Sequence, residues 1–109
     1  MKLPNWKNAY IPSEKLTGYL LSESHSIGKS KAKFFRAIGF NEANTDVLKH
    51  HLISIAQSED VTEVVSTARG IKYVLDGFIQ SSRGNLKIRT VWIIEKGQDR
   101  PRFVTAYPA

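Results

Sequence analysis

The spacing of apolar residues along the chain changes near Gln57. Before this point, apolar residues recur every three or four positions, which is typical of helices that bury one face. After it, apolar and β-branched residues alternate with polar ones, which is typical of strands. The pattern therefore predicts an α+β fold, with helices in the first half of the chain and a sheet in the second.

Three helices are predicted in the first half. A capping signal at Pro12-Ser13 begins one, and apolar residues at helical spacing extend it to about residue 21. After a polar stretch over 22–28, a second helix begins near Lys29 and ends at Gly39, a residue type that favours a left-handed stop. A third helix covers about 45–57. The expected buried positions are Leu16, Tyr19, Leu20, Phe34, Phe35, Ile38, Leu48, Leu52 and Ile55.

Four strands are predicted, over about 61–67, 71–79, 86–95 and 102–107. The turns expected around 81–85 and 96–99 contain Gly, Ser, Asn and Asp, residue types that form tight turns. We therefore expect a four-stranded antiparallel meander with the three helices packed on one face. Strict alternation in the last strand places Phe103, Thr105 and Tyr107 on one face and Arg102, Val104 and Ala106 on the other.

The composition is that of one globular domain over 1–109. Of the 109 residues, 41% are hydrophobic and 24% are charged, close to the average for folded proteins. The chain has no Cys, which excludes disulfides, zinc-thiolate sites and cysteine nucleophiles. No apolar run approaches the ~18 residues of a membrane span, so no membrane partner is expected. Without Cys or a signal-peptide pattern the expected location is the cytoplasm, although a domain from the tail of a larger secreted protein would look the same.

The charge of the chain is unevenly distributed. Its formal net charge is +6, made up of +5 over residues 1–40, −3 over 41–69 and +4 over 70–109. Two basic ends around an acidic middle would suit an anionic partner, such as RNA, that meets both ends together. The alternative is ordinary solvated surface charge.

Motifs for metals and for nucleotide cofactors do not occur in the sequence. There is no HExxH, no clustered carboxylates and no His-x-His spacing, so we expect no metal site. There is also no P-loop, no GxGxxG and no GxSxG. We therefore expect neither a cofactor nor a serine nucleophile.

Lys31 lies at the edge of the apolar stripe of the second predicted helix, three and four residues before Phe34 and Phe35. One interpretation is that its stem covers the core while its ammonium stays in water. The other is that the ammonium is held near the sheet, facing an anionic ligand. The sequence alone leaves both open.

His25 lies in the polar stretch just before that helix. Gly28 and the helix N-terminus offer backbone N–H groups for an anion, and a His beside such a site can act as a general acid or base. The alternative is an idle loop residue. His50 and His51 are weaker candidates, because His51 falls on the apolar stripe of its predicted helix and is expected in the core, while His50 is expected to face solvent. Adjacent helical residues also point about 100° apart, so the pair suits a metal poorly.

Arg89 stands in the strand over 86–95, where polar positions give way to apolar ones. An Arg on a central strand must be paired, stacked or functional. Asp76 is either its partner or a turn residue before Gly77. Thr90 and Thr105 are candidates for ligand contacts, or are present only because Thr favours strands.

Together these residues form a set of His, Lys, Arg, Thr and Tyr without acids. Such a set is suited to binding phosphate and, in some enzymes, to cleaving RNA without a metal. In that reaction the 2′-hydroxyl attacks the adjacent phosphorus while a base takes its proton. Cations stabilise the phosphate, and an acid protonates the leaving 5′ oxygen.

Ordered motifs along nearly the whole chain carry a resemblance to a known family. They include His25-x-x-Gly28-x-x-Lys31-Ala32-x-Phe34-Phe35, Asp76-Gly77, Arg89-Thr90-x-Trp92-Ile93 and Pro101-Arg102-x-Val104-Thr105-x-Tyr107-Pro108. In these motifs the chain resembles an uncharacterised bacterial domain family, found as small stand-alone proteins and as C-terminal domains of polymorphic toxins. Its order of helices and strands is similar to that of the barnase/colicin/RelE-like class of metal-independent RNases.

The resemblance implies a set of polar site residues. One departure from the family pattern is Ser26, which stands where the family usually has Pro, so the loop carrying His25 is expected to be less rigid. The matching polar residues are His25, Lys31, Arg89, Thr90, Thr105 and Tyr107.

We therefore predict a toxin-like, metal-independent endoribonuclease, or a degenerate relative of one. The alternative is a non-catalytic module that binds RNA, or that binds a small acidic immunity-type protein as half of a toxin–immunity pair. The sequence leaves the oligomeric state open. The predicted catalytic residues are His25, Lys31, Arg89 and Thr105, and the predicted substrate-binding residues are Thr90, Tyr107, Arg102 and Trp92.

Overall fold

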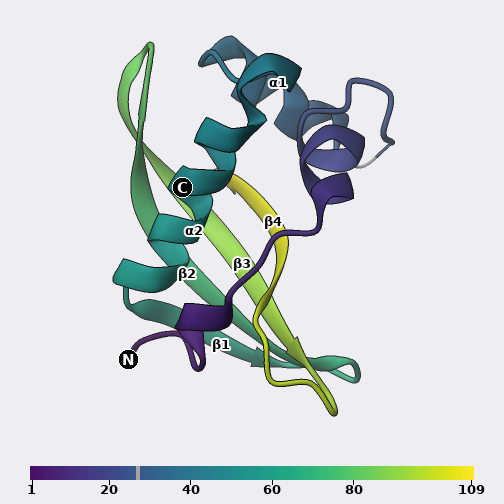
Figure 1. Ribbon diagram of the computed structural model, residues 1–109, viewed down its shortest axis with the longest axis vertical. Helices are drawn as coiled ribbons and strands as arrows, with labels where there is room; N and C mark the ends of the chain where they lie inside the picture. The colour runs from purple at the N-terminus through teal and green to yellow at the C-terminus, as the bar shows by residue number, and fades with distance from the viewer. Residues whose placement is uncertain (27) are drawn as a thin grey trace.

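The computed structural model describes residues 1–26 and 28–109 and has the predicted α+β architecture (Figure 1). The helical elements are η1 (Trp6–Asn8), η2 (Ser13–Lys15), η3 (Leu16–Leu20), α1 (Lys29–Ala37), η4 (Glu42–Asn44) and α2 (Thr45–Ser58). The strands are β1 (Val61–Ser66), β2 (Gly70–Ser81), β3 (Gly84–Glu95) and β4 (Arg102–Pro108). Among the described residues, no helix is long and apolar enough to cross a bilayer.

The first predicted helix, over about 13–21, is helical but is not an α-helix. It consists of the 3₁₀ turn η2 followed by the π-helical turn η3. The N–H of Leu21 donates to the carbonyl of Leu16, five residues back, at 2.7 Å. This wider turn brings residues five apart to the same side, and Leu16, Leu20 and Leu21 are all buried. Burial of all three side chains therefore outweighs regular α-helical geometry here.

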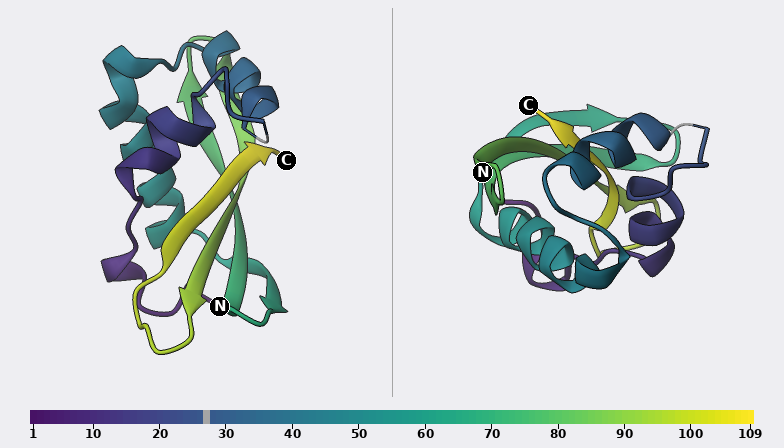
Figure 2. Two further views of the ribbon diagram at one scale, coloured as in Figure 1. Left: turned by 90° about the vertical axis from the view of Figure 1, so that its right-hand side faces the viewer. Right: turned by 90° about the horizontal axis from the view of Figure 1, so that it is seen from above.

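The four strands form one antiparallel sheet in the order β1-β2-β3-β4, as the turns predicted. Figure 2 shows that the sheet is strongly twisted. Helix α2 packs on one face of β2 and β3 (Figure 1). The approach is close at Gly77, where a Cβ would lie 2.7 Å from the Ile55 side chain. We call the face covered by α2 the inner face, and the opposite one the outer face.

Strand β4 departs from strict alternation. Val91 of β3 pairs with Thr105, but the next residue, Trp92, pairs with Phe103. Val104 is therefore an extra residue, a β-bulge, in β4. An extra residue shifts the alternation of side chains by one position. The residues of β4 before Val104 and those after it therefore alternate between the two faces of the sheet in opposite phase.

The bulge decides which residues of β4 face the core. Phe103 and Ala106 are both fully buried on the inner face. Thr105 and Tyr107 lie on the outer face, together with Arg102. The predicted grouping of Phe103 with Thr105 and Tyr107 was therefore wrong, as was that of Ala106 with Arg102, because a bulge leaves no local mark in the sequence.

Thr90 and Trp92 lie on the inner face, and both are fully buried. The Thr90 hydroxyl donates to the Leu75 carbonyl at 2.8 Å and accepts from the Trp92 indole N–H at 2.9 Å. Trp92 also packs edge-on against Phe103, with ring centroids 5.3 Å apart. Thr90 thus supplies the hydrogen bond that a buried tryptophan requires. This corrects the prediction that Thr90 and Trp92 contact a substrate, since neither reaches the surface.

Replacing Thr90 by Val should lower the free energy of unfolding by about 1–3 kcal/mol. Val keeps the shape of the side chain but leaves the indole N–H of Trp92 buried without an acceptor. Urea unfolding followed by tryptophan fluorescence measures the loss. The control Thr90→Ser keeps the hydroxyl and loses one methyl, a cost of about 1 kcal/mol. A Val variant as stable as the wild type would contradict the role of this hydrogen bond.

Candidate functional site

Residues from the N-terminal helical segments and from β4 meet around Tyr19, at the outer face of the sheet. The Tyr19 hydroxyl is 2.9 Å from Oγ1 of Thr105. The His25 ring stands edge-on to the Tyr19 ring, with centroids 5.1 Å apart. Lys31 Nζ lies 5.8 Å from the Tyr19 ring centroid and 6.0 Å from that of Tyr107. We call these five residues the Tyr19 cluster; each is partly exposed.

His25 is held by the backbone of its own loop. The N–H of Gly28 donates to Nδ1 of His25 at 3.0 Å. Because Nδ1 is the acceptor, the neutral ring carries its proton on Nε2. Gly28 packs so closely against Tyr19 that a Cβ would lie 2.3 Å from the Tyr19 carbonyl oxygen. These contacts position the His25 ring although Ser26 stands in place of the family's Pro.

Arg89 lies next to the cluster on β3, opposite Tyr107 of β4 and Asp76 of β2. Its Nε and one terminal nitrogen donate to the two oxygens of Asp76, at 2.9 and 3.0 Å. These hydrogen bonds are the main reason why the pKa of Asp76 lies below its ordinary value; the charges of Arg89 and Lys87 add to the effect, and burial opposes it. Asp76 is therefore the partner of Arg89. The pair uses two of the five N–H donors of a guanidinium, so three can still meet a ligand.

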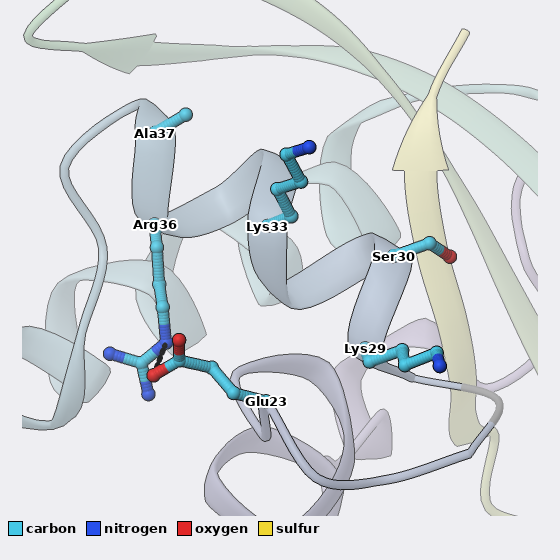
Figure 3. A pocket seen from close by; sticks show the side chains of 6 residues that line it. All are labelled: Glu23, Lys29, Ser30, Lys33, Arg36 and Ala37. Atoms are coloured by element: carbon cyan, nitrogen blue, oxygen red, sulfur yellow. Dashed lines mark ion pairs between the residues drawn. The ribbon is translucent and has the colours of Figure 1, made fainter.

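Lys31 faces a different side of α1 from the other two lysines of that helix. Residues two apart in a helix point about 200° apart, so Lys29 and Lys33 lie on the far side of α1. There they line a hollow of about 790 Å³ with Ser30, Ala37, Glu23 and Arg36 (Figure 3). Arg36 pairs with Glu23 at 3.5 Å and with Glu42. This hollow is separate from the Tyr19 cluster.

The structure brings together five of the eight predicted site residues, which are His25, Lys31, Arg89, Thr105 and Tyr107. Thr90 and Trp92 lie on the opposite face, in the core. Arg102 is also on the outer face, but at the start of β4 and before the cluster residues of that strand. Its Nε donates to Glu95 at 3.0 Å. Sequence reasoning missed Tyr19 as a site residue, because it occupies an apolar position of a predicted helix. The feature of the sequence that could have revealed it is the Tyr19 hydroxyl, a polar group on an otherwise apolar helical stripe.

His50 and His51 take no part in this cluster. His51 packs edge-on against Phe40, with ring centroids 6.1 Å apart. Burial lowers the pKa of His51, and the neighbouring His50 lowers it further. In the part of the chain that the structure describes, no three His, Cys, Asp or Glu residues are grouped so as to hold a metal ion.

Comparisons with known proteins identify an uncharacterised family and a solved structure of similar fold. The family described as a domain of unknown function, DUF6883, matches residues 2–109. No curated protein sequence matches the chain. A solved chain from a contact-dependent growth inhibition toxin–immunity protein complex of Klebsiella pneumoniae 342 has a similar fold, with a TM-score of 0.69 and 14% identity over 94% of this chain and 95% of that one. The expected resemblance to an uncharacterised domain family is thereby confirmed, and the solved chain shows that the fold occurs elsewhere.

Replacing Asp76 by Asn should destabilise the protein in a pH-dependent way. The folded-state pKa of Asp76 is lowered, so its stabilising effect is present above the ordinary Asp pKa of about 4 and is lost as the pH falls through the lowered value. Near pH 7 we expect a loss of about 1 kcal/mol, since Arg89 is partly exposed and solvent screens the pair. Urea unfolding across this pH range would show the difference between wild type and variant shrinking in acid. Asp99→Asn, at an exposed acid, is the control; a difference independent of pH would contradict the assignment.

Proposed function

The chain belongs to the DUF6883 family, and from its site we propose that it is a toxin-type endoribonuclease that needs no metal ion. The observation that carries this proposal is the meeting of His25, Lys31, Thr105 and Tyr107 beside Arg89 on one partly exposed face. Three separate parts of the chain contribute to it. One carboxylate beside the cluster, that of Asp76, is already bound to Arg89. Such a surface suits a phosphodiester better than a metal or a cationic substrate.

The proposed reaction is intramolecular transfer within the RNA. The 2′-oxygen forms a bond to the adjacent phosphorus as a base takes its proton. The bond from phosphorus to the 5′ oxygen breaks, and that oxygen receives a proton. The products are a 2′,3′-cyclic phosphate and a 5′-hydroxyl end.

The geometry suggests a role for each residue of the site. Lys31 and the remaining N–H groups of Arg89 would stabilise the negative charge that develops on the phosphate. His25 would act as the acid or the base of these proton transfers, and while its neutral ring accepts at Nδ1 from Gly28, its Nε2–H can donate a hydrogen bond to a phosphate oxygen. Thr105, fixed by Tyr19, and Tyr107 would orient the substrate.

Replacing Lys31 by Met should abolish cleavage while leaving the fold intact. Met keeps a similar stem against the aromatic rings but removes the charge, a change expected to cost at least about 100-fold in rate. The assay incubates the protein with total tRNA and rRNA in excess EDTA and analyses the product ends for 2′,3′-cyclic phosphate. His25→Ala should also be inactive.

The matched control is Lys33→Met, which removes the same charge from the other side of α1. It should cleave like the wild type, and thermal unfolding should show that all variants are folded. Full cleavage by both Lys31→Met and His25→Ala would contradict the assigned site. Absence of cleavage by the wild type would favour a non-catalytic module.

A second candidate function is protein binding within a toxin–immunity pair. Two observations favour it: the structural neighbour comes from a toxin–immunity complex, and this chain carries a net charge of +6. The partner would be a small acidic protein covering the basic site. Co-purification with a small acidic product of the adjacent gene would support this role, and it is compatible with the ribonuclease proposal.

A further inference from the structure

A basic hollow lies on the outer face next to the Tyr19 cluster. Its volume is about 170 Å³, several times the ≈ 30 Å³ that a water molecule occupies in the liquid. We call it the Arg102 hollow. It is lined by Lys15, Arg69, Lys72, Ile93, Arg102 and Val104.

The four cations of this hollow come from three separate parts of the chain. Lys15 ends η2, Arg69 lies in the turn before β2, Lys72 is on β2 and Arg102 is on β4. Glu95 binds two of them, accepting from Arg102 at 3.0 Å and from Arg69 at 3.5 Å. The fold therefore gathers a local charge of about +3 against the mutual repulsion of its members. Binding an anion would relieve this repulsion.

The hollow is built to hold an anion firmly. Its floor includes the aliphatic side chain of Ile93, which is 3% exposed, and charges act more strongly over an apolar, low-dielectric surface. Arg102 is 24% exposed and is fixed by Glu95, so little of its rotamer freedom remains to be lost on binding. The ion pair uses one of its five N–H donors. The rest can meet phosphate oxygens in the paired geometry that guanidinium favours.

The Arg102 hollow and the Tyr19 cluster are connected. Lys15 lines the hollow and also holds its ammonium 4.8 Å from the Tyr19 ring centroid. On β4, Val104 of the hollow is followed directly by Thr105, which bonds to the Tyr19 hydroxyl. A ligand with negative charges at regular intervals could therefore occupy both places at once. A polynucleotide is such a ligand, whereas a mononucleotide is not.

We propose that the Arg102 hollow binds a backbone phosphate of the RNA, on a nucleotide flanking the one cleaved at the Tyr19 cluster. The identity of the ligand rests on the proposed function. An RNA strand is favoured over an acidic protein segment because its phosphates recur evenly along one chain and can meet both connected cationic places. The substrate is thus an RNA of several nucleotides, held at more than one phosphate.

The test uses the double variant Arg69→Met/Lys72→Met, which leaves the Tyr19 cluster untouched. The matched control is Lys29→Met/Lys33→Met, which removes the same charge from the far side of α1. Fluorescence anisotropy would measure binding of a labelled 2′-O-methyl RNA of about 12 nucleotides, which lacks the attacking hydroxyl and stays intact. We expect the test variant to bind at least tenfold more weakly, and the slope of log affinity against log salt to fall by about 0.7 for each phosphate that the variant no longer binds.

Cleavage provides a second readout. The double variant should cleave a dinucleotide at the wild-type rate but lose at least tenfold in kcat/KM on a longer RNA. Equal loss on both substrates would overturn the flanking subsite, as would unchanged affinity and salt slope for the 2′-O-methyl RNA.

If the wild type cleaves nothing, yet the test variant binds RNA more weakly than the control, the hollow stands as an RNA site and only the ribonuclease proposal fails. If the wild type binds no RNA, the hollow's assignment is overturned in favour of an acidic protein partner.

Discussion

The β-bulge at Val104 is the constraint on which both faces of this protein depend. With one extra residue in β4, Phe103 faces the core beside Trp92, while Thr105 and Tyr107 are carried to the outer face. Without it, the alternation of β4 could not serve the core and the site together. Bulges often lie beside functional sites, where they redirect side chains. Here the bulge lets one short edge strand contribute aromatic packing to one side and polar groups to the other.

The positive charge of the outer face is held in place by ion pairs between arginines and carboxylates. Asp76 and Glu95 each bind an arginine from a neighbouring strand. These pairs fix the guanidinium groups without removing all of their donors. Lys15 and Lys31 both lie near the ring of Tyr19, so the hydroxyl-bearing ring joins the two basic places on this face. The face is thus cationic but ordered, which favours a ligand of defined geometry over non-specific attraction.

The fold and the function of this chain have separate physical origins. Similarity at 14% identity over nearly the whole length shows that the arrangement of helices and sheet tolerates extensive sequence change. Folds of this kind host unrelated activities, and a site has to be judged by its own groups. Phosphate chemistry is therefore inferred from the contacts around Tyr19 and Arg89. Membership of a family described as a domain of unknown function does not indicate a particular reaction.

Local patterns in the sequence were enough to predict the α+β class, the two α-helices, the four strands and their antiparallel order. These features depend on periodicity and turn composition, which are properties of neighbouring residues. His25, Lys31 and Arg89 were also predicted as candidates, because polar residues out of keeping with their surroundings can be recognised locally. Only the tertiary structure placed Trp92 in the core and Tyr19 at the centre of the candidate site. Trp92 is buried because the face of β3 that carries Ile88, Thr90 and Trp92 is covered, and alternation alone does not say which face that is. The position of Tyr19 depends on its contact with Thr105 of β4, and contacts between residues so distant in the chain leave no periodic signal.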